Sequence, residues 1–308
     1  MKRVTLRSIK RAYVKKWRYV LYMLPVIFLF GLFVYYPRLS VIPLSFYKWG
    51  PYSFTKEYVG LFNYKMLFEA RLNETLGYIG NTVIYVAGLL VIQTLLAFIL
   101  ALALQKNTRG NKFFRTYFFF PMVLSSTLVS LTWSYMYDPN LGIINSLLGA
   151  LGVNGYPGVN FFATNVTAIL LIVLVHIWAK IGYPMMVLTS GLSTVSGDLE
   201  EAAKIEGANR WQIFWKITIP LMLPTLLRLS LMTISTGVMA SDYVVMMGSR
   251  SSVRDFDTLS AYIYKKTLMS STYGEVSAIS VCLLVVLSVV SLVQFVSLKK
   301  VENSILGE

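Results

Sequence analysis

The chain has 308 residues, of which 56% are hydrophobic and 14% are charged, and its mean hydropathy of +0.62 excludes an ordinary soluble domain and indicates an integral membrane protein. The net charge of +14 does not indicate a nucleic-acid partner, because the lysines and arginines flank apolar segments instead of gathering on one polar surface. With one cysteine, Cys282, and one histidine, His176, the composition also excludes a disulfide framework and a metal site built from several thiolates or imidazoles.

Residues 1–18 hold eight lysines or arginines and no acid. Their apolar residues fall near helical spacing, which predicts a cytoplasmic amphipathic elbow helix lying at the interface with anionic membrane lipid. The uncharged segment 19–37 is about long enough to cross a bilayer. A cleaved signal peptide would need a small-residue cleavage site, and none follows Pro37, so we expect this segment to remain as an anchor.

Five further apolar segments are long enough to cross a membrane. They are expected at about residues 76–105, 116–137, 164–192, 217–241 and 276–298, followed by a cytoplasmic tail at 299–308. Residues 38–74 mix proline, aromatic residues and both signs of charge, which is typical of an external loop. Glycine, asparagine and proline between residues 140 and 165 predict an external re-entrant segment or short helix. The predicted fold class is an all-α integral membrane protein with six transmembrane helices.

The distribution of positive charge orients these spans. If both termini, residues 106–115 and the loop between spans 4 and 5, counted from Lys180 to Lys216, lie inside, the inside holds 18 lysines and arginines and the outside holds nine, with Arg228 left within a span. The positive-inside rule therefore predicts that both termini are cytoplasmic. It also places the loop between spans 4 and 5 in the cytoplasm.

That loop contains the knob, which we define as residues 196–220. Asp198 is a candidate helix N-cap, with Glu201 three residues later as in an acidic capping box. Gly207 is expected to end this first short helix. A second amphipathic run, residues 211–217, is expected to stop at Pro220. A capped helical hairpin of this kind could serve in any cytoplasmic loop, but its alanine-rich flank would also let a partner's groove close around it.

The spacing within the knob resembles the EAA loop of ABC-importer membrane subunits, written E-A-A-x3-G-x9-I-x-L-P. Ile219 stands where that pattern has leucine. In similar permeases this loop is the coupling helix that contacts the ATPase. The resemblance implies an ATPase-coupling loop formed by Glu200, Glu201, Ala202, Ala203, Glu206, Gly207, Ala208 and Pro220.

The resemblance covers most of the chain from residue 20 onward and is closest to carbohydrate-uptake permeases of the MalF-like, binding-protein-dependent type. It is strongest at residues 193–220 and 267–278, where Tyr273-Gly-Glu precedes the last span. After Asp242 the chain departs from the Thr-x-Gly-Gly-Pro loop of similar proteins. This variant loop is typical of the branch that imports larger oligosaccharides, and the chain has no room for a large external insert.

The chain lacks a phosphate-binding loop of the G-x-x-x-x-G-K-[ST] type, because no glycine is followed by lysine. Nor does it show a hydrolytic constellation, so we expect a transport subunit and not an enzyme. The resemblance implies that this chain holds no cofactor of its own and that ATP and Mg are bound by partner ATPase subunits. The implied partners are two ABC ATPase subunits, a second homologous permease subunit and an extracytoplasmic solute-binding (lipo)protein that delivers the carbohydrate.

Polar side chains within membrane spans are the default candidates for a substrate pathway, because burying them in a bilayer is costly. His176, Lys180, Arg228 and Asp242 fit this description, and Asp242 matches an acidic residue of similar permeases. Flat rings and hydroxyl groups suit a sugar, which adds the aromatic candidates Trp133, Tyr135, Trp178, Tyr183 and Tyr243. Three ordinary explanations stay open: Trp and Tyr anchor helices at the membrane interface, Lys180 and Arg228 can extend to that interface, and His176 can hydrogen-bond a neighbouring helix.

The sequence therefore predicts one half of the translocation pathway of a carbohydrate importer in the bacterial cytoplasmic membrane. A glycerol-phosphodiester or polyol substrate on the same architecture is the nearest alternative. An ion-coupled secondary transporter that uses Lys180 or Asp242 is a second alternative, although no internal inverted repeat supports it. A non-transport scaffold is a third.

Overall fold

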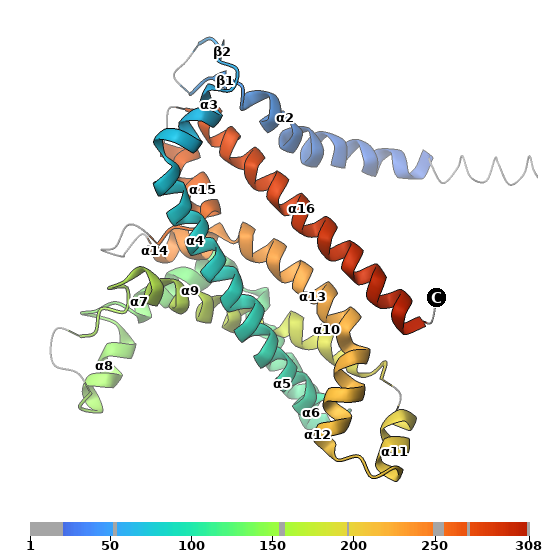
Figure 1. Ribbon diagram of the computed structural model, residues 1–308. Coiled ribbons are helices and arrows are strands. Elements are labelled where there is room, and N and C mark those ends of the chain that lie inside the picture. The colour runs from blue at the N-terminus through green and yellow to red at the C-terminus, as the bar shows by residue number, and fades with distance from the viewer. Residues whose placement is uncertain are drawn as a thin grey trace, which may run out of the picture. The chain divides into compact units, whose positions relative to one another are not determined.

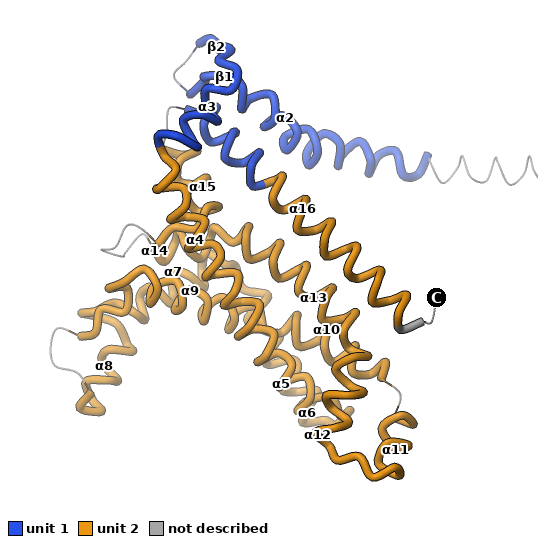
Figure 2. Tube along the Cα trace, in the orientation of Figure 1, with its two compact units in different colours: residues 1–70, 270–283 blue, residues 71–269, 284–308 orange. Residues whose placement is uncertain are grey.

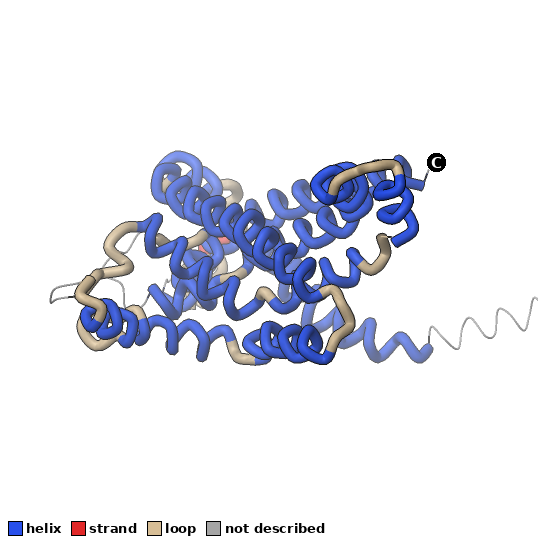
Figure 3. The backbone as a smooth tube through the Cα atoms, turned by 90° about the horizontal axis from the view of Figure 1, so that it is seen from below, coloured by secondary structure: helices blue, strands red, loops and turns tan. Residues whose placement is uncertain are grey.

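The computed structural model describes residues 21–51, 54–153, 158–195, 197–248, 256–269 and 272–306. The expected elbow helix at 1–18 lies outside the described residues. The described chain is almost entirely helical, with one short strand pair, as Figures 1 and 3 show. It divides into unit 1, residues 1–70 and 270–283, and unit 2, residues 71–269 and 284–308 (Figure 2).

Unit 1 begins with a helix over Leu21–Leu44. It continues seven residues beyond the expected end at Pro37, because a π-helical turn at Gly31–Tyr35 leads into a segment with Pro37 in its first turn, where proline needs no N–H partner. The last part of this helix is α2 Tyr36–Leu44. The remaining elements of unit 1 are β1 Tyr47–Lys48, β2 Glu57–Tyr58, α3 Phe62–Lys65, η2 Met66–Ala70 and the start of α16 Tyr273–Leu306.

Backbone contacts join the hairpin of unit 1 to the beginning of α16. Strands β1 and β2 are antiparallel, with Tyr47 opposite Tyr58. The amide of Asn63 donates to the carbonyl oxygens of Ser45 and Tyr47, at 2.8 and 3.1 Å. The backbone N–H of Tyr273 donates to the carbonyl oxygen of Trp49 at 2.7 Å. These bonds satisfy polar backbone groups that a two-residue strand pair cannot satisfy alone.

Unit 2 contains the other helices. Its first half consists of α4 Leu72–Gly88, η3 Leu89–Gln93, α5 Thr94–Leu104, α6 Arg109–Phe119, η4 Phe120–Val123, α7 Ser126–Met136 and α8 Ile143–Ala150. Its second half consists of α9 Asn165–Lys180, α10 Gly182–Leu192, α11 Gly197–Ile205, α12 Arg210–Ile213, η5 Phe214–Thr218, α13 Ile219–Met239, α14 Ser241–Gly248 and α15 Leu259–Met269, followed by the rest of α16.

Four helices are long and apolar enough to cross a membrane, among the residues described. They cover Leu21–Leu44, Leu72–Leu104, Arg210–Gly248 and Tyr273–Ser304. Two further helix pairs pass the same test together but are bent, Arg109–Val123 with Ser126–Met136 by 95° and Asn165–Lys180 with Gly182–Leu192 by 58°. The structure therefore has four to six candidate spans, which makes the chain a multi-pass membrane protein.

The bends have local causes. Ser125 is in extended conformation between η4 and α7, directly after the Pro121 turn. In the second pair, Pro184 lies at the third position of α10 and supplies no N–H to the preceding turn. Gly182 permits a close crossing here, because a Cβ on it would lie 2.6 Å from Phe119 Cα. Expected spans 3 and 4 are thus each built from two helices.

The core of unit 2 lies where α10 packs on α5, α4 on α9, and α14 on α7. Its fully buried side chains include Tyr85, Leu89, Ile172, Met185 and Met222. Small residues bring the helices together, as is usual where lipid supplies no hydrophobic driving force: a Cβ on Gly88 would lie 3.0 Å from a methyl group of Val173.

Candidate functional site: a polar pocket and an exposed knob

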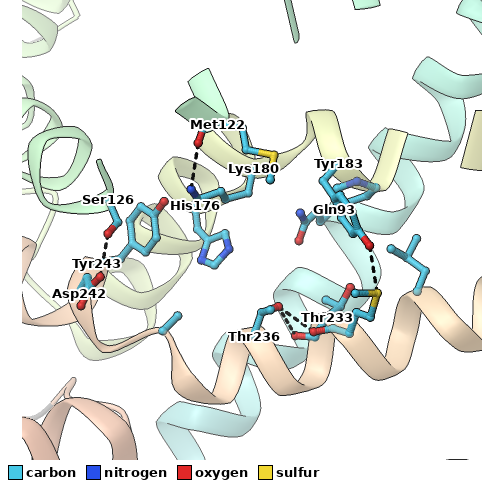
Figure 4. Close-up of a pocket in the computed structure, with 14 residues that line it drawn as sticks. Gln93, Met122, Ser126, His176, Lys180, Tyr183, Thr233, Thr236, Asp242 and Tyr243 are labelled. Atoms are coloured by element: carbon cyan, nitrogen blue, oxygen red, sulfur yellow. Dashed lines mark hydrogen bonds between the residues drawn. The ribbon is translucent and has the colours of Figure 1, made fainter. Parts of the chain in front are cut away.

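A pocket of about 360 Å³ opens among the helices of unit 2 (Figure 4). It is lined by Gln93, Met122, Ser126, His176, Lys180, Tyr183, Pro184, Leu229, Met232, Thr233, Thr236, Ala240, Asp242 and Tyr243. These residues come from η3, η4, α7, α9, α10, α13 and α14, together with the residue between the last two. Its volume lies within the usual range for small-ligand sites.

His176 is held on two sides by aromatic residues. Its Nδ1 lies 2.7 Å from the hydroxyl oxygen of Tyr85. Its ring stacks on Tyr243, with centroids 4.7 Å apart and an interplanar angle of 29°. Figure 4 shows the imidazole projecting into the cavity beside Tyr243. Since Nδ1 is engaged, Nε2 is the ring nitrogen left to face a ligand.

Tyr243 and Asp242 form the adjoining wall, on the first turn of α14. Tyr243 is 3% exposed. Its hydroxyl oxygen is buried and has no hydrogen-bond partner among the described residues. Asp242 is exposed to the cavity and accepts a hydrogen bond of 2.7 Å from the Ser126 hydroxyl. A buried hydroxyl without a partner is costly, so this wall has unused capacity to bind a polar group.

The rest of the lining carries a cation and further hydroxyl groups. Lys180 Nζ donates to the carbonyl oxygen of Met122 at 3.4 Å, a long contact that leaves its other N–H groups for a ligand. The Tyr183 hydroxyl donates to the sulfur of Met232 at 3.1 Å. Thr236 donates to the carbonyl oxygen of Met232 at 2.8 Å. The pocket thus offers one positive charge, one negative charge and several hydroxyl groups.

Five of the nine candidates for the pathway meet in this pocket: His176, Lys180, Tyr183, Asp242 and Tyr243. The other four, Trp133, Tyr135, Trp178 and Arg228, do not line it. Trp133 and Trp178 instead make an edge-to-face pair with centroids 5.6 Å apart, and Tyr135 is exposed.

Sequence reasoning missed the polar lining residues Gln93, Ser126, Thr233 and Thr236. Gln93 gave a usable signal, since it is the one amide between residues 83 and 104 and is buried in the fold. The hydroxyl residues gave none, because Ser and Thr are common in transmembrane helices.

The knob is a pair of short helices joined by a tight turn. Gly207 has φ +88°. Its N–H donates to the Lys204 carbonyl oxygen at 3.1 Å, and the N–H of Ala208 donates to that of Ala203 at 2.9 Å. This is the Schellman arrangement that ends a helix on a left-handed residue. The sequence predicted the end of the helix at Gly207, and the structure places it there.

Two details of the knob differ from expectation. Helix α11 already includes Gly197 and Asp198, so Asp198 lies in its first turn, where a carboxylate favours the positive end of the helix dipole, and is not the N-cap. The second helix is capped by Asn209, through a reciprocal pair of 2.8 Å bonds with Gln212. It does not stop at Pro220: the wide turn η5 precedes the proline and the helix continues as α13.

The expected coupling residues lie on the surface of this knob. Ala203, Ala208 and Glu200 are half-buried; Glu201, Ala202, Glu206, Gly207 and Pro220 are exposed. Large apolar side chains accompany them, with Ile205 87% and Trp211 70% exposed. Within the described ranges, no three His, Cys, Asp or Glu side chains gather in a way that could hold a metal ion.

Comparison with known proteins gives relatives along almost the whole chain. The chain is 28% identical over 296 residues to a multiple sugar-binding transport system permease, MsmF, of Streptococcus mutans, covering 96% of this chain and 99% of the relative. It is 30% identical over 297 residues to a lactose transport system permease, LacF, of Rhizobium radiobacter, covering 94% and 95%. These relatives are named as transport permeases and not as enzymes.

The fold is similar to that of a chain from a bacterial ABC transporter involved in the import of the acidic polysaccharide alginate. The TM-score is 0.79 at 21% identity, covering 95% of this chain and 98% of the other. The family model described as the binding-protein-dependent transport system inner membrane component matches residues 93–304. This confirms the resemblance to ABC-importer permeases of carbohydrate uptake. The chain belongs to the family of binding-protein-dependent transport system inner membrane components.

Proposed function

We propose that the chain is a permease subunit of an ATP-driven ABC importer in the bacterial cytoplasmic membrane and forms half of the translocation pathway for a carbohydrate, an oligosaccharide in particular. In this proposal, an extracytoplasmic binding protein delivers the substrate. A second homologous permease forms the other half of the pathway. Two partner ATPases bind ATP and Mg and supply the free energy.

The proposal takes each bent helix pair as one span, which gives six spans. The positive-inside rule then orients them with both termini and the knob in the cytoplasm. In this orientation the cytoplasmic side holds 18 lysines and arginines and the external side holds nine, which supports it. The knob is then on the side where an ATPase is found.

One observation carries the mechanism: a helical run that is broken at Ala240 joins the knob to the pocket. Helical residues run without a break from Arg210, beside the exposed Trp211, to Met239. After the break at Ala240, helix α14 carries Asp242 and Tyr243 in the pocket wall. At 1.5 Å per residue, Trp211 and Thr233 are roughly 33 Å apart along the helical run. Figure 1 shows α11 and α12 at one end of unit 2 and α14 toward the other.

The helix on the other side of the knob also reaches the pocket. Helix α10 contributes Tyr183 and Pro184 to the lining and ends at Leu192, just before the knob. A force on the knob therefore acts on two pocket walls at once. In the proposal, closure of the ATPases on nucleotide moves the knob, and the two helices change access to the pocket.

The chemistry of the pocket supports a neutral, hydroxyl-rich substrate. Lys180 and Asp242 carry opposite charges, so the lining as a whole does not select a strongly charged ligand. Hydroxyl groups of Ser126, Tyr243 and Thr233 match the donors and acceptors of a saccharide. The relatives named for sugar and lactose transport support the same substrate class.

The test is uptake by the complete complex in proteoliposomes, with the binding protein outside and ATP inside. Gly207→Val is expected to abolish uptake while ATP hydrolysis persists, because a β-branched residue cannot adopt φ +88° and the turn of the knob must rearrange. Gly197→Ala is the matched control, since nothing lies within 4 Å of its added Cβ. Normal uptake by the Gly207 variant at equal assembly would contradict the coupling role.

The substrate class and the energy source are tested in two separate uptake experiments. Uptake of labelled oligosaccharides should exceed that of a glycerol phosphodiester or a polyol. The phosphodiester remains a candidate because Lys180 could pair with its phosphate, although Asp242 in the same pocket would repel it. Accumulation by this chain alone under a proton or sodium gradient would favour an ion-coupled secondary transporter and overturn the proposal.

A further inference from the structure

Tyr85 does not line the pocket, yet it contacts a residue that does. It lies on α4, is completely buried, and its hydroxyl is 2.7 Å from His176 Nδ1. Among the described residues, His176 is the one hydrogen-bond partner of the Tyr85 hydroxyl. The two residues are 91 positions apart in sequence, so only the packing of α4 on α9 brings them together.

The position of the protons follows from satisfying both groups. If Nδ1 carried the proton of a neutral imidazole, the hydroxyl proton of Tyr85 would be buried with no acceptor, which is unfavourable. If Tyr85 donates to Nδ1, both atoms are satisfied and the imidazole proton must lie on Nε2. In a doubly protonated ring Nε2 would carry a proton as well. Every favourable arrangement therefore makes Nε2 a donor.

We propose that Tyr85 is a positioning residue that fixes the tautomer of His176, so that Nε2–H donates a hydrogen bond to an oxygen atom of the substrate in the pocket. Stacking on Tyr243 at 4.7 Å fixes the plane of the same ring. The Tyr243 hydroxyl beside it has no partner among the described residues and supplies a second group for the same ligand oxygen or its neighbour. The ligand role rests on the proposed function, whereas the tautomer does not.

The first experiment reads the tautomer directly by nitrogen NMR of the assembled complex in nanodiscs. The complex is labelled with ¹⁵N-histidine and purified through a tag without histidine. His176 is the only histidine of this chain, so subtracting the spectrum of His176→Gln isolates its two ring nitrogens. We expect Nε2 protonated and Nδ1 unprotonated in the wild type, and a mixture of tautomers in Tyr85→Phe. A proton on Nδ1 in the wild type overturns the proposal.

The second experiment measures uptake kinetics of the whole importer with an oligosaccharide. Tyr85→Phe should raise KM roughly three- to tenfold, the value of one hydrogen bond, with kcat changed less than twofold. Tyr78→Phe is the matched control: it removes a hydroxyl from the same helix, one that is bonded to Glu74 at 3.0 Å, and Tyr78 does not line the pocket. It should leave KM unchanged.

A double-mutant comparison separates positioning from structure. His176→Gln places an amide nitrogen near Nε2 that donates regardless of Tyr85. Tyr85→Phe should therefore have no further effect on KM in the His176→Gln background. An equal loss in both backgrounds would show a structural role and overturn the proposal. If Tyr85→Phe does not assemble, the wild-type spectrum decides; if the wild type moves no carbohydrate, the proposed function fails while the spectrum still tests the tautomer.

Discussion

Two tyrosines that both contact His176 have hydroxyl groups with opposite roles, because the partners of these hydroxyl groups differ. The Tyr85 hydroxyl is buried and paired with His176, so its removal leaves a buried nitrogen without a partner. The Tyr243 hydroxyl is buried without a partner among the described residues, so its removal takes away an uncompensated polar group. Substitution of each by phenylalanine therefore changes the free energy of unfolding in opposite directions.

For Tyr243→Phe we expect the empty complex to become more stable, by about 1 kcal/mol, and the KM for substrate to rise. Both follow from one cause, since the hydroxyl costs free energy when unpaired and contributes when a ligand pairs with it. Thermal unfolding with and without oligosaccharide measures both effects. A variant that is less stable when empty, with unchanged KM, would show that the hydroxyl has a structural partner.

Gly274 is the second residue of α16 and lies against the backbone of Tyr47 in unit 1. A Cβ at this position would lie 1.8 Å from the carbonyl oxygen of Tyr47 and 2.9 Å from the amide nitrogen of Asn63. We expect Gly274→Ala to destabilise the protein by about 1–3 kcal/mol, because backbone must move to relieve the overlap. Gly77→Ala is the control, with nothing within 4 Å of its added Cβ. Equal thermal midpoints for the two variants would disprove this steric account.

At the scale of elements, two ion pairs in unit 2 differ in how far water reaches them. Lys265 and Asp257 approach to 2.7 Å, with side chains 32% and 10% exposed. They join α15 to the segment before it, and Asn81 on α4 donates to the Asp257 carbonyl oxygen at 3.0 Å. Arg228 and Glu302 join α13 to the end of α16, with side chains 60% and 31% exposed.

We expect Asp257→Asn to lower the free energy of unfolding by about 2–3 kcal/mol, since it leaves a partly buried ammonium without its counter-charge. Glu302→Gln should change it by less than about 1 kcal/mol, because solvent screens the exposed pair. Denaturant titration of both variants, with matched refolding controls, gives the comparison. A larger effect for the exposed pair would mean that the α13–α16 contact is buried by a partner subunit in the assembled importer.

At the scale of the whole molecule, the orientation in the membrane can be read with single cysteines. Cys282 is the only cysteine, so Cys282→Ser gives a background without thiols. Lys204→Cys in the knob and Glu57→Cys in β2 are both at exposed positions. A membrane-impermeant maleimide should label Glu57→Cys in intact cells and Lys204→Cys only after permeabilisation. Labelling of Lys204→Cys from outside would place the knob on the wrong side for an ATPase.

The amino-acid sequence by itself determined the features that depend on local chemistry. Long apolar runs require helices that satisfy their own backbone hydrogen bonds. Gly207 specifies a left-handed helix end, because few other residues adopt that conformation without strain. The knob could therefore be located, and its spacing identified the family, since both depend on residues within about 25 positions of each other.

The tertiary structure decided which polar residues share a site. His176, Lys180, Tyr183, Asp242 and Tyr243 come together because α9 and α10 are bent by 58° and α14 packs on α9. Trp133, Tyr135 and Trp178 do not line the pocket, although the sequence indicated them equally. The partnership of Tyr85 with His176 joins positions 91 residues apart. A pocket between helices is set by crossing angles and contacts distant in sequence, and no pattern within a single segment specifies them.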